Sequence, residues 1–164
     1  MQTKSMNYSK SQLFWLVTLR VLIGWHFLYE GLVKLVNPNW SGIGYLMDSG
    51  GFMAGFFQGL AANQSTLQVI DFINIWGLIA IGLGLILGSF TRIASIAGII
   101  LLALYYLSHP PFPGIKYAMP MEGSYLIVNK ILIEMVALAV LFLFPTGKEF
   151  GMEKFICRKP NLKS

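Results

Sequence analysis

The sequence predicts an all-α fold, a four-helix transmembrane bundle with a long extracytoplasmic helical cap loop between the first and second helices. Two observations support this class. The 164 residues are 55% hydrophobic and 12% charged, whereas a typical soluble domain has about twice that charged fraction. Long apolar runs also recur along the chain, and a buried helix of a soluble protein does not need such length repeatedly.

Four predicted helices follow one another along the chain. The first covers Leu13–Leu35 and the second covers Leu67–Leu87. The third, Ile93–Leu107, reaches about 18 residues when Phe90–Arg92 are added to it, and the fourth covers Tyr125–Phe144. Because a helix needs roughly 20 residues to cross about 30 Å of hydrocarbon, we expect all four to span the bilayer.

The connecting segments differ between the two sides of the predicted bundle. Residues 36–66 hold two short apolar pieces, GIGYLM and GFMAGFFQGL, separated by Ser49–Gly51. Neither piece can span a bilayer, so we expect both to lie in the interface or to fold back as a cap. The prolines of residues 108–123 predict an irregular lid. GSFT at 88–91 predicts a tight turn, and Pro145–Gly147 is expected to end the fourth helix.

The distribution of bases predicts the orientation. Eight bases lie in the amino-terminal arm, the turn after the second helix and the carboxyl-terminal tail, whereas the opposite loops hold Lys116. By the positive-inside rule, both termini are cytoplasmic. Lys4 and Lys10 precede the first run, but that run is too long for a signal peptide, so we expect it to remain as the first helix. Residues 1–150 are expected to form one membrane domain, and 151–164 a basic cytoplasmic tail.

Composition also disfavours several function classes. The net charge of +5 follows from the bias between the two sides, and without a concentrated basic face no nucleic-acid partner is expected. Dithiol exchange needs two thiols, and Cys157 is the one cysteine; we interpret it as a reduced thiol, with lipidation as the alternative. His26 and His109 fall at different depths, which argues against a bis-histidine haem. No metal-ligand spacing occurs, so no metal is expected.

Charged residues inside the predicted helices are the main candidates for function. They are Arg20, Glu30, Lys34, Asp71, Lys130 and Glu134. A lone charge at the centre of a membrane helix costs about 2.5–3.5 kcal/mol, so we expect these residues to face the bundle interior and to find partners. On the first helix, one stripe at 100° per residue holds Arg20, Gly24, Gly31 and Lys34. Glu30 and His26 lie beside that stripe, and its glycines allow a neighbouring helix to approach closely.

The position of each residue along its predicted helix puts most of these side chains in the outer half of the bundle. There they would line a pocket that opens outward. The candidate catalytic residues are Glu30, His26 and Glu134. The candidate cofactor-binding residues are Lys34, Asp71, Asn74, Asn129 and Lys130. Tyr105, Tyr106 and His109 would form the rim, and Arg20, in the inner half, would be a structural anchor beside Gly24 and Gly31. A structural interpretation also remains, in which lysines snorkel and i,i+4 pairs merely neutralise each other.

The first helix carries the pattern LRxxxGxxFxxxGxxK from Leu19 to Lys34, followed by Asn37-Pro38. This pattern, with the four-helix plan and the long first outer loop, resembles the DoxX family, which includes DoxD-like proteins, over about residues 12–150. The positions that carry over are Arg20, Gly24, Gly31 and Lys34; Asp71, Lys130 and Glu134 are not matched. The resemblance implies a bacterial inner-membrane protein linked to redox chemistry, since some members are subunits of a thiosulfate:quinone oxidoreductase.

We therefore expect an oxidoreductase subunit whose pocket binds a quinone or a small anionic sulfur compound. Lys34 and Lys130 would supply positive charge. Glu30, Asp71 or Glu134 would carry protons, with His26 as a relay. Electrons would need a bound cofactor or a redox partner subunit, and a homo-oligomer remains open. The alternatives are a non-enzymatic scaffold or assembly factor for an oxidoreductase partner and, less favoured because the inner half offers little polarity, a small transporter.

Overall fold

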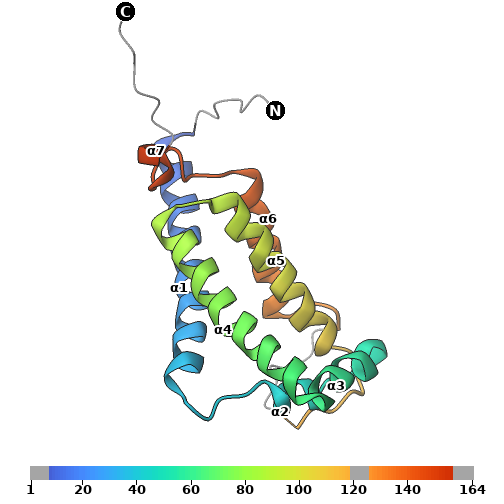
Figure 1. Cartoon of the computed structure of the whole chain (residues 1–164). Coiled ribbons are helices and arrows are strands. Elements are labelled where there is room, and N and C mark those ends of the chain that lie inside the picture. Colours follow the sequence, from blue (N-terminus) through green and yellow to red (C-terminus); the bar gives the residue numbers. More distant parts are fainter. Residues whose placement is uncertain (1–7, 119–125, 157–164) are drawn as a thin grey trace, which may run out of the picture.

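The computed structural model describes residues 8–118 and 126–156, and every regular element in these ranges is helical. The elements are α1 (Lys10–Val36), α2 (Ile43–Met47), η1 (Gly51–Met53), α3 (Ala54–Ala62), α4 (Gln64–Leu87), α5 (Thr91–Ser108), α6 (Lys130–Leu143) and α7 (Glu153–Ile156). In Figure 1, α1 begins and α7 lies at one end of the molecule, here called the terminal end. The opposite end, where α2 and α3 lie, is called the cap end.

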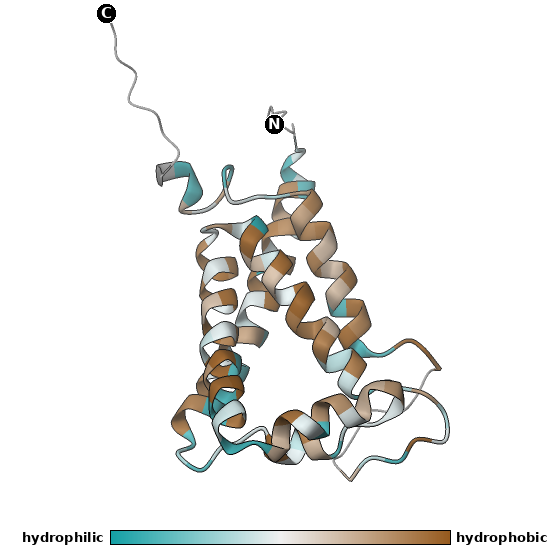
Figure 2. Cartoon of the chain, turned by 45° about the vertical axis from the view of Figure 1, so that its right-hand side comes forward, coloured by the Kyte–Doolittle hydropathy of each residue, from teal (hydrophilic) through white to brown (hydrophobic). Residues whose placement is uncertain are grey.

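The membrane assignment rests on three of these helices. Among the described residues, α1, α4 and α5 are long and apolar enough to cross a membrane. Apolar colour covers much of their length in Figure 2. Large apolar side chains on them, such as Trp25, Phe72 and Ile100, are exposed. Large exposed apolar surfaces of this kind are stable only against lipid or another protein. The chain is therefore a membrane protein whose helices contact the lipid bilayer.

The predicted start of the fourth helix is wrong. α6 begins at Lys130 and has 14 residues, which gives a length of about 21 Å. Leu126 has a φ of 66°, and Asn129 is extended at the N-cap, so residues 126–129 cannot continue a helix toward the N-terminus. Tyr125, the predicted first residue, lies outside the described residues.

Other sequence predictions of local structure are confirmed. The turn at 88–91 follows α4, with Gly88 as a left-handed C-cap at φ 65°, a conformation that costs glycine little. The two apolar pieces of the first long loop form α2 and then η1 with α3. α5 includes Thr91 and Arg92, so the third helix takes in most of the residues that could extend it.

Neighbouring helices pack in the order α1, α4, α5 and α6, and α6 also touches α1. The buried core centres on Phe27, Leu85 and Leu138. α1 and α4 approach each other closely at Gly82, because a Cβ on Gly82 would lie 2.5 Å from the Leu28 amide nitrogen and 2.7 Å from the Gly24 carbonyl oxygen. Small residues at this crossing allow close backbone packing, which is the main source of helix association in lipid.

Candidate functional site

A lysine near the end of α1 lies at the centre of a polar cluster toward the cap end. Lys34 Nζ donates to Asn74 Oδ1 at 3.1 Å and to the Tyr105 hydroxyl at 3.5 Å. Asn74 Nδ2 donates to the same hydroxyl at 2.6 Å. These three residues, the Lys34 cluster, come from α1, α4 and α5, so the cluster joins three helices at one depth.

Two aromatic rings and one carboxylate lie close to the Lys34 ammonium. Nζ lies 5.2 Å from the Trp40 ring centroid and 5.6 Å from that of Tyr105, within range of a cation–π interaction. The Glu30 carboxylate lies 4.0 Å away, and its side chain is half exposed, whereas that of Lys34 is 16% exposed. The ammonium therefore has two neutral acceptors at hydrogen-bonding distance and a carboxylate at the outer limit of an ion pair.

Asp71 does not join the Lys34 cluster by any hydrogen bond in the described structure. Its Oδ2 accepts from Ser41 Oγ at 2.8 Å, and its Oδ1 accepts from the Gly42 amide at 3.0 Å. A Cβ on Gly42 would lie 2.8 Å from Asp71 Oδ1, so the carboxylate sits tightly against the loop backbone. Asp71 thereby ties the segment between α1 and α2 to the first turns of α4.

A second polar pair bridges α1 and α6. His26 Nδ1 and Glu134 Oε1 are 2.8 Å apart, and the two side chains are 48% and 14% exposed. Sequence reasoning placed His26 beside Glu30, but the structure gives it a partner that is 108 residues away. Glu30 and Lys130 also act electrostatically on the imidazole. Among the predicted pocket residues, Lys34 and Asn74 thus form one group and His26 and Glu134 another, and Glu30 acts electrostatically on both groups.

The remaining candidates mark the start of α6 and the α1–α4 contact. Asn129 is the N-cap of α6, where its side chain accepts from the Leu132 amide at 2.9 Å, and Lys130 is the first helical residue. Gly24 and Gly31 face α4, since a Cβ on either would come within 3.0 Å of Ile86 or Ile79.

Arg20 lies toward the terminal end, away from both polar groups. The side chain is 3% exposed. Its Nη1 donates to Thr146 Oγ1 at 2.9 Å, and its Nη2 donates to the Phe150 carbonyl at 2.8 Å. These contacts join α1 to the segment that follows α6. Sequence reasoning anticipated the depth of Arg20 but not these partners.

The cap end holds a buried histidine that sequence reasoning assigned to the rim of a pocket. His109 is 1% exposed. Its ring lies between those of Tyr45 and Tyr117, with centroid distances of 4.0 Å and 4.8 Å. Nε2 lies 3.8 Å from Asp48 Oδ2, and Nδ1 lies 3.1 Å from Ser108 Oγ. The histidine therefore joins α2, the end of α5 and the following loop.

Acidification is expected to weaken this packing of the cap. Burial lowers the pKa of His109, and the Asp48 carboxylate offsets this only in part. The closed cap therefore takes up a proton less readily than the unfolded chain, whose histidine has a pKa of about 6.5. The free energy of unfolding therefore falls as the pH drops below about 6.5, toward the lower pKa that His109 has in the folded state. Unfolding midpoints at pH 7.5 and 5.5 check this, and His109→Gln should show a smaller difference between the two than the wild type. An unchanged difference would contradict the prediction.

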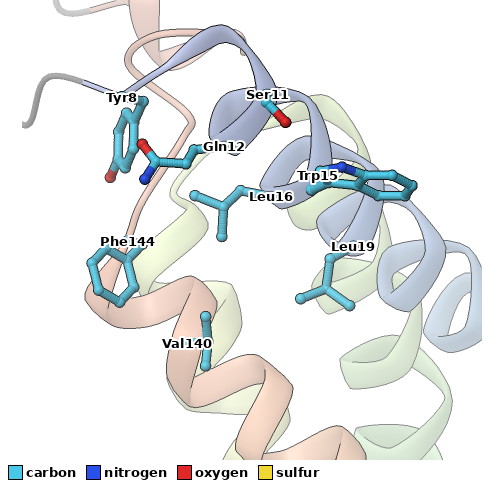
Figure 3. Close-up of a pocket in the computed structure, with 8 residues that line it drawn as sticks. All are labelled: Tyr8, Ser11, Gln12, Trp15, Leu16, Leu19, Val140 and Phe144. Carbon is cyan, nitrogen blue, oxygen red and sulfur yellow. The ribbon is translucent and has the colours of Figure 1, made fainter.

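A hollow that the sequence did not predict lies at the terminal end (Figure 3). This groove runs between the beginning of α1 and the end of α6 and has a volume of about 590 Å³. Its lining residues are Tyr8, Ser11, Gln12, Trp15, Leu16, Leu19, Val140 and Phe144. Their types are ordinary for a membrane helix, and only the separation of α1 from α6 makes the groove. The sequence carries no signal of that separation.

Metal ligands do not gather in the part of the chain that the structure describes, where no three His, Cys, Asp or Glu side chains come together. Cys157, the candidate thiol, lies outside the described residues.

Tyr105 is the polar residue whose importance sequence reasoning underestimated, because it accepts hydrogen bonds from both Lys34 and Asn74. Its place in the last turn of α5 was the available signal.

Comparison with known proteins gives one family. The DoxX family model matches residues 15–110, more than half of the chain. No curated protein and no solved structure matches the chain. The matched range contains Lys34, Asn74 and Tyr105, and it ends before α6 and Glu134.

Proposed function

The chain belongs to the DoxX family, and on that premise we propose that it is a redox-linked subunit of a bacterial inner membrane that binds a quinone or a small anionic sulfur compound at the Lys34 cluster. In this proposal, both termini are cytoplasmic, so the cap end faces outward. α6, although it is shorter than the other three helices, is the fourth helix of the bundle in this proposal. The positive-inside bias supports this orientation.

One observation carries the proposal. The ammonium of Lys34 is largely buried, and its two hydrogen-bond acceptors are both neutral. A charge inside a membrane helix costs about 2.5–3.5 kcal/mol unless it finds a counter-charge. Glu30 lies at 4.0 Å on a half-exposed side chain, and Asp71 acts on Lys34 without a hydrogen bond to it, so the two carboxylates compensate the charge incompletely. An anion, or the oxyanion that develops on a quinone as it is reduced, would complete the compensation.

The second polar group supports proton transfer. Reduction of a quinone to a quinol consumes two electrons and two protons. Glu30 connects the two groups electrostatically, because its charge acts on both Lys34 and His26. Carboxylates and an imidazole are the usual groups that carry protons in proteins, so this arrangement supports a proton relay. The electrons come from the sulfur compound or from a redox partner subunit.

Replacing Lys34 with methionine is expected to weaken thiosulfate binding at least about tenfold, because a hydrogen bond to a charged group contributes about 1.5–3 kcal/mol. Titration calorimetry of the protein in lipid nanodiscs would measure the change. Lys10→Met, which removes an exposed lysine at the terminal end, is the matched control and should bind as the wild type does. Equal affinity in Lys34→Met and the wild type would contradict the anion site.

The scaffold alternative also has an observation in its favour. Phe52 and Phe56 at the cap end are 77% and 56% exposed, and aromatic side chains of this kind are enriched where proteins bind one another. Affinity capture from membranes separates the two functions. The scaffold is favoured if the variant Glu30→Gln/Lys34→Met retains its partner and the complex still reduces quinone with thiosulfate. A retained partner with lost turnover favours the Lys34 site.

A further inference from the structure

Two aromatic side chains cover the Lys34 cluster from the cap end. Trp40, in the loop after α1, has its ring centroid 5.2 Å from Lys34 Nζ. Tyr45 belongs to α2, which lies at the cap end in Figure 1. Its ring meets that of Tyr105 edge-on, with 5.7 Å between the centroids, and its hydroxyl donates to the Tyr105 carbonyl oxygen at 3.4 Å. The Lys34 side chain is 16% exposed, whereas Val36, two residues later, is 78% exposed. The cap therefore shields the ammonium at this end of α1.

The end of α5 holds α2 in this position. The His109 ring lies against the Tyr45 ring, with 4.0 Å between the centroids. Next to it, Ser108 Oγ and Ser49 Oγ are 2.6 Å apart, and the Gly50 amide donates to the Ser108 carbonyl oxygen at 2.9 Å. Contacts with two consecutive residues, Ser108 and His109, therefore keep α2 and the turn after it closed over the cluster.

The surroundings of the His109 ring suit a neutral imidazole. The charged and titratable groups that face it are Tyr45 and Asp48 of the α2 segment and Tyr117 of the loop after α5. Asp48 Oδ2 lies 3.8 Å from Nε2, which is too far for a hydrogen bond, and Asp48 Oδ1 accepts from the Ala118 amide at 2.8 Å. A protonated imidazole donates from both nitrogens, so its Nε2–H would be buried without an acceptor among the described residues. Separation of α2 from the end of α5 would let water solvate that donor.

The beginning of α2 is attached to a different helix. Asp71 of α4 accepts from Ser41 Oγ at 2.8 Å and from the Gly42 amide at 3.0 Å, and α2 begins at the next residue, Ile43. Because this attachment does not involve His109, loss of the His109 contact would leave the start of α2 in place. α2 can then swing about Ser41 and Gly42, which lie in a loop as hinge residues commonly do.

We propose that α2 is a proton-controlled lid over the Lys34 cluster, in which protonation of His109 releases Tyr45 and α2 swings outward about its attachment to Asp71. Opening exposes the Lys34 ammonium from the cap end. As a control of ligand access, the lid rests on the proposed function, but its movement is measurable without a ligand. In the proposed orientation the cap end faces outward, so the lid responds to the pH outside the cell.

Distance measurements between two spin labels test the movement. One label is placed at Met47→Cys, the last residue of α2, and the other at Val69→Cys on α4; these positions are 54% and 56% exposed. Cys157→Ser removes the one native cysteine. Double electron–electron resonance should show one distance at pH 7.5 and an additional distance at pH 5.0. His109→Gln cannot take up the proton, so this variant should keep the single distance at both pH values.

The matched control moves one label to the attached end of α2. Ile43 is 45% exposed and directly follows Gly42, so the pair Ile43→Cys/Val69→Cys should keep one distance at both pH values. A Met47–Val69 distance that does not change at pH 5.0, or that changes equally in His109→Gln, would overturn the proposal. An equal change at Ile43 would show that the whole cap loosens, and it would overturn the hinged lid.

An engineered disulfide tests whether the lid controls access. The hydroxyl oxygens of Ser49 and Ser108 are 2.6 Å apart, so Ser49→Cys/Ser108→Cys, with Cys157→Ser, places two thiols within reach of a disulfide. Oxidation should hold the lid closed and weaken thiosulfate binding at pH 5.0 at least about tenfold relative to the reduced form, because a closed state that does not bind lowers the apparent affinity. Equal binding by the two forms would overturn the control of access. Absence of thiosulfate binding in every form would count against the Lys34 site, whereas the spin-label distances would still decide whether the lid moves.

Discussion

Replacement of Arg20 with glutamine is expected to lower the thermal unfolding midpoint of the detergent-solubilised protein by roughly 5–15 °C. The guanidinium is buried and donates to Thr146 Oγ1 and to the Phe150 carbonyl. Glutamine is too short to reach both acceptors and carries no charge to balance Glu153, which interacts electrostatically with Arg20. Loss of such contacts costs about 2–4 kcal/mol.

The control for this prediction keeps the charge and changes its shape. Arg20→Lys retains a cation, but its ammonium cannot serve two acceptors in the fixed fork of a guanidinium. Its unfolding midpoint should fall between those of the wild type and Arg20→Gln. Differential scanning fluorimetry in one detergent measures all three proteins. A midpoint for Arg20→Gln within about 2 °C of wild type corresponds to a loss of no more than about 1 kcal/mol. Such a result would show that the contacts of Arg20 contribute little to the stability of the fold.

Sequence reasoning located the long helices well because their signal is local. Apolar length and the breaks at Asn37-Pro38 and Gly88 define where α1 and α4 end, and each of those signals is present in a few consecutive residues. The start of α6 was not predictable in this way. Val128 and Ile127 are as apolar as any helix residue, and the left-handed backbone at Leu126 carries no side-chain signature that would set it apart.

The candidate site shows the same division between local and distant information. The polar stripe of α1 follows from helix periodicity, and it brings Lys34 to the helices that supply Asn74 and Tyr105. The partners of Asp71 and His26 depend instead on how a loop closes and how α6 tilts. Asp71 is held by Ser41 and Gly42, and His26 by Glu134. Depth alone placed all of these residues in one pocket, because depth contains no information about rotation around the bundle.

Replacement of Gly82 with alanine is expected to destabilise the protein by about 1–3 kcal/mol, through separation of α1 and α4. A Cβ at this position would lie 2.5 Å from the Leu28 amide nitrogen and 2.7 Å from the Gly24 carbonyl oxygen. Both atoms belong to the backbone of α1, so no side-chain rotation can relieve the overlap. The helices must move apart instead, and this weakens the packing on which helix association in lipid depends.

Gly77→Ala provides the matched control in the same helix. A Cβ on Gly77 meets no atom within 4 Å, so the substitution removes only the flexibility of glycine and should stabilise α4 by up to about 1 kcal/mol. Changes of opposite sign in the unfolding midpoint of the two variants would show that Gly82 is required for close approach of the helices rather than for backbone freedom.

Because the α1–α4 contact also sets the distance between Lys34 and Asn74, Gly82→Ala should weaken thiosulfate binding as well, whereas Gly77→Ala should leave it unchanged. A Gly82→Ala protein as stable as the wild type would mean that the crossing tolerates a wider separation than its geometry indicates.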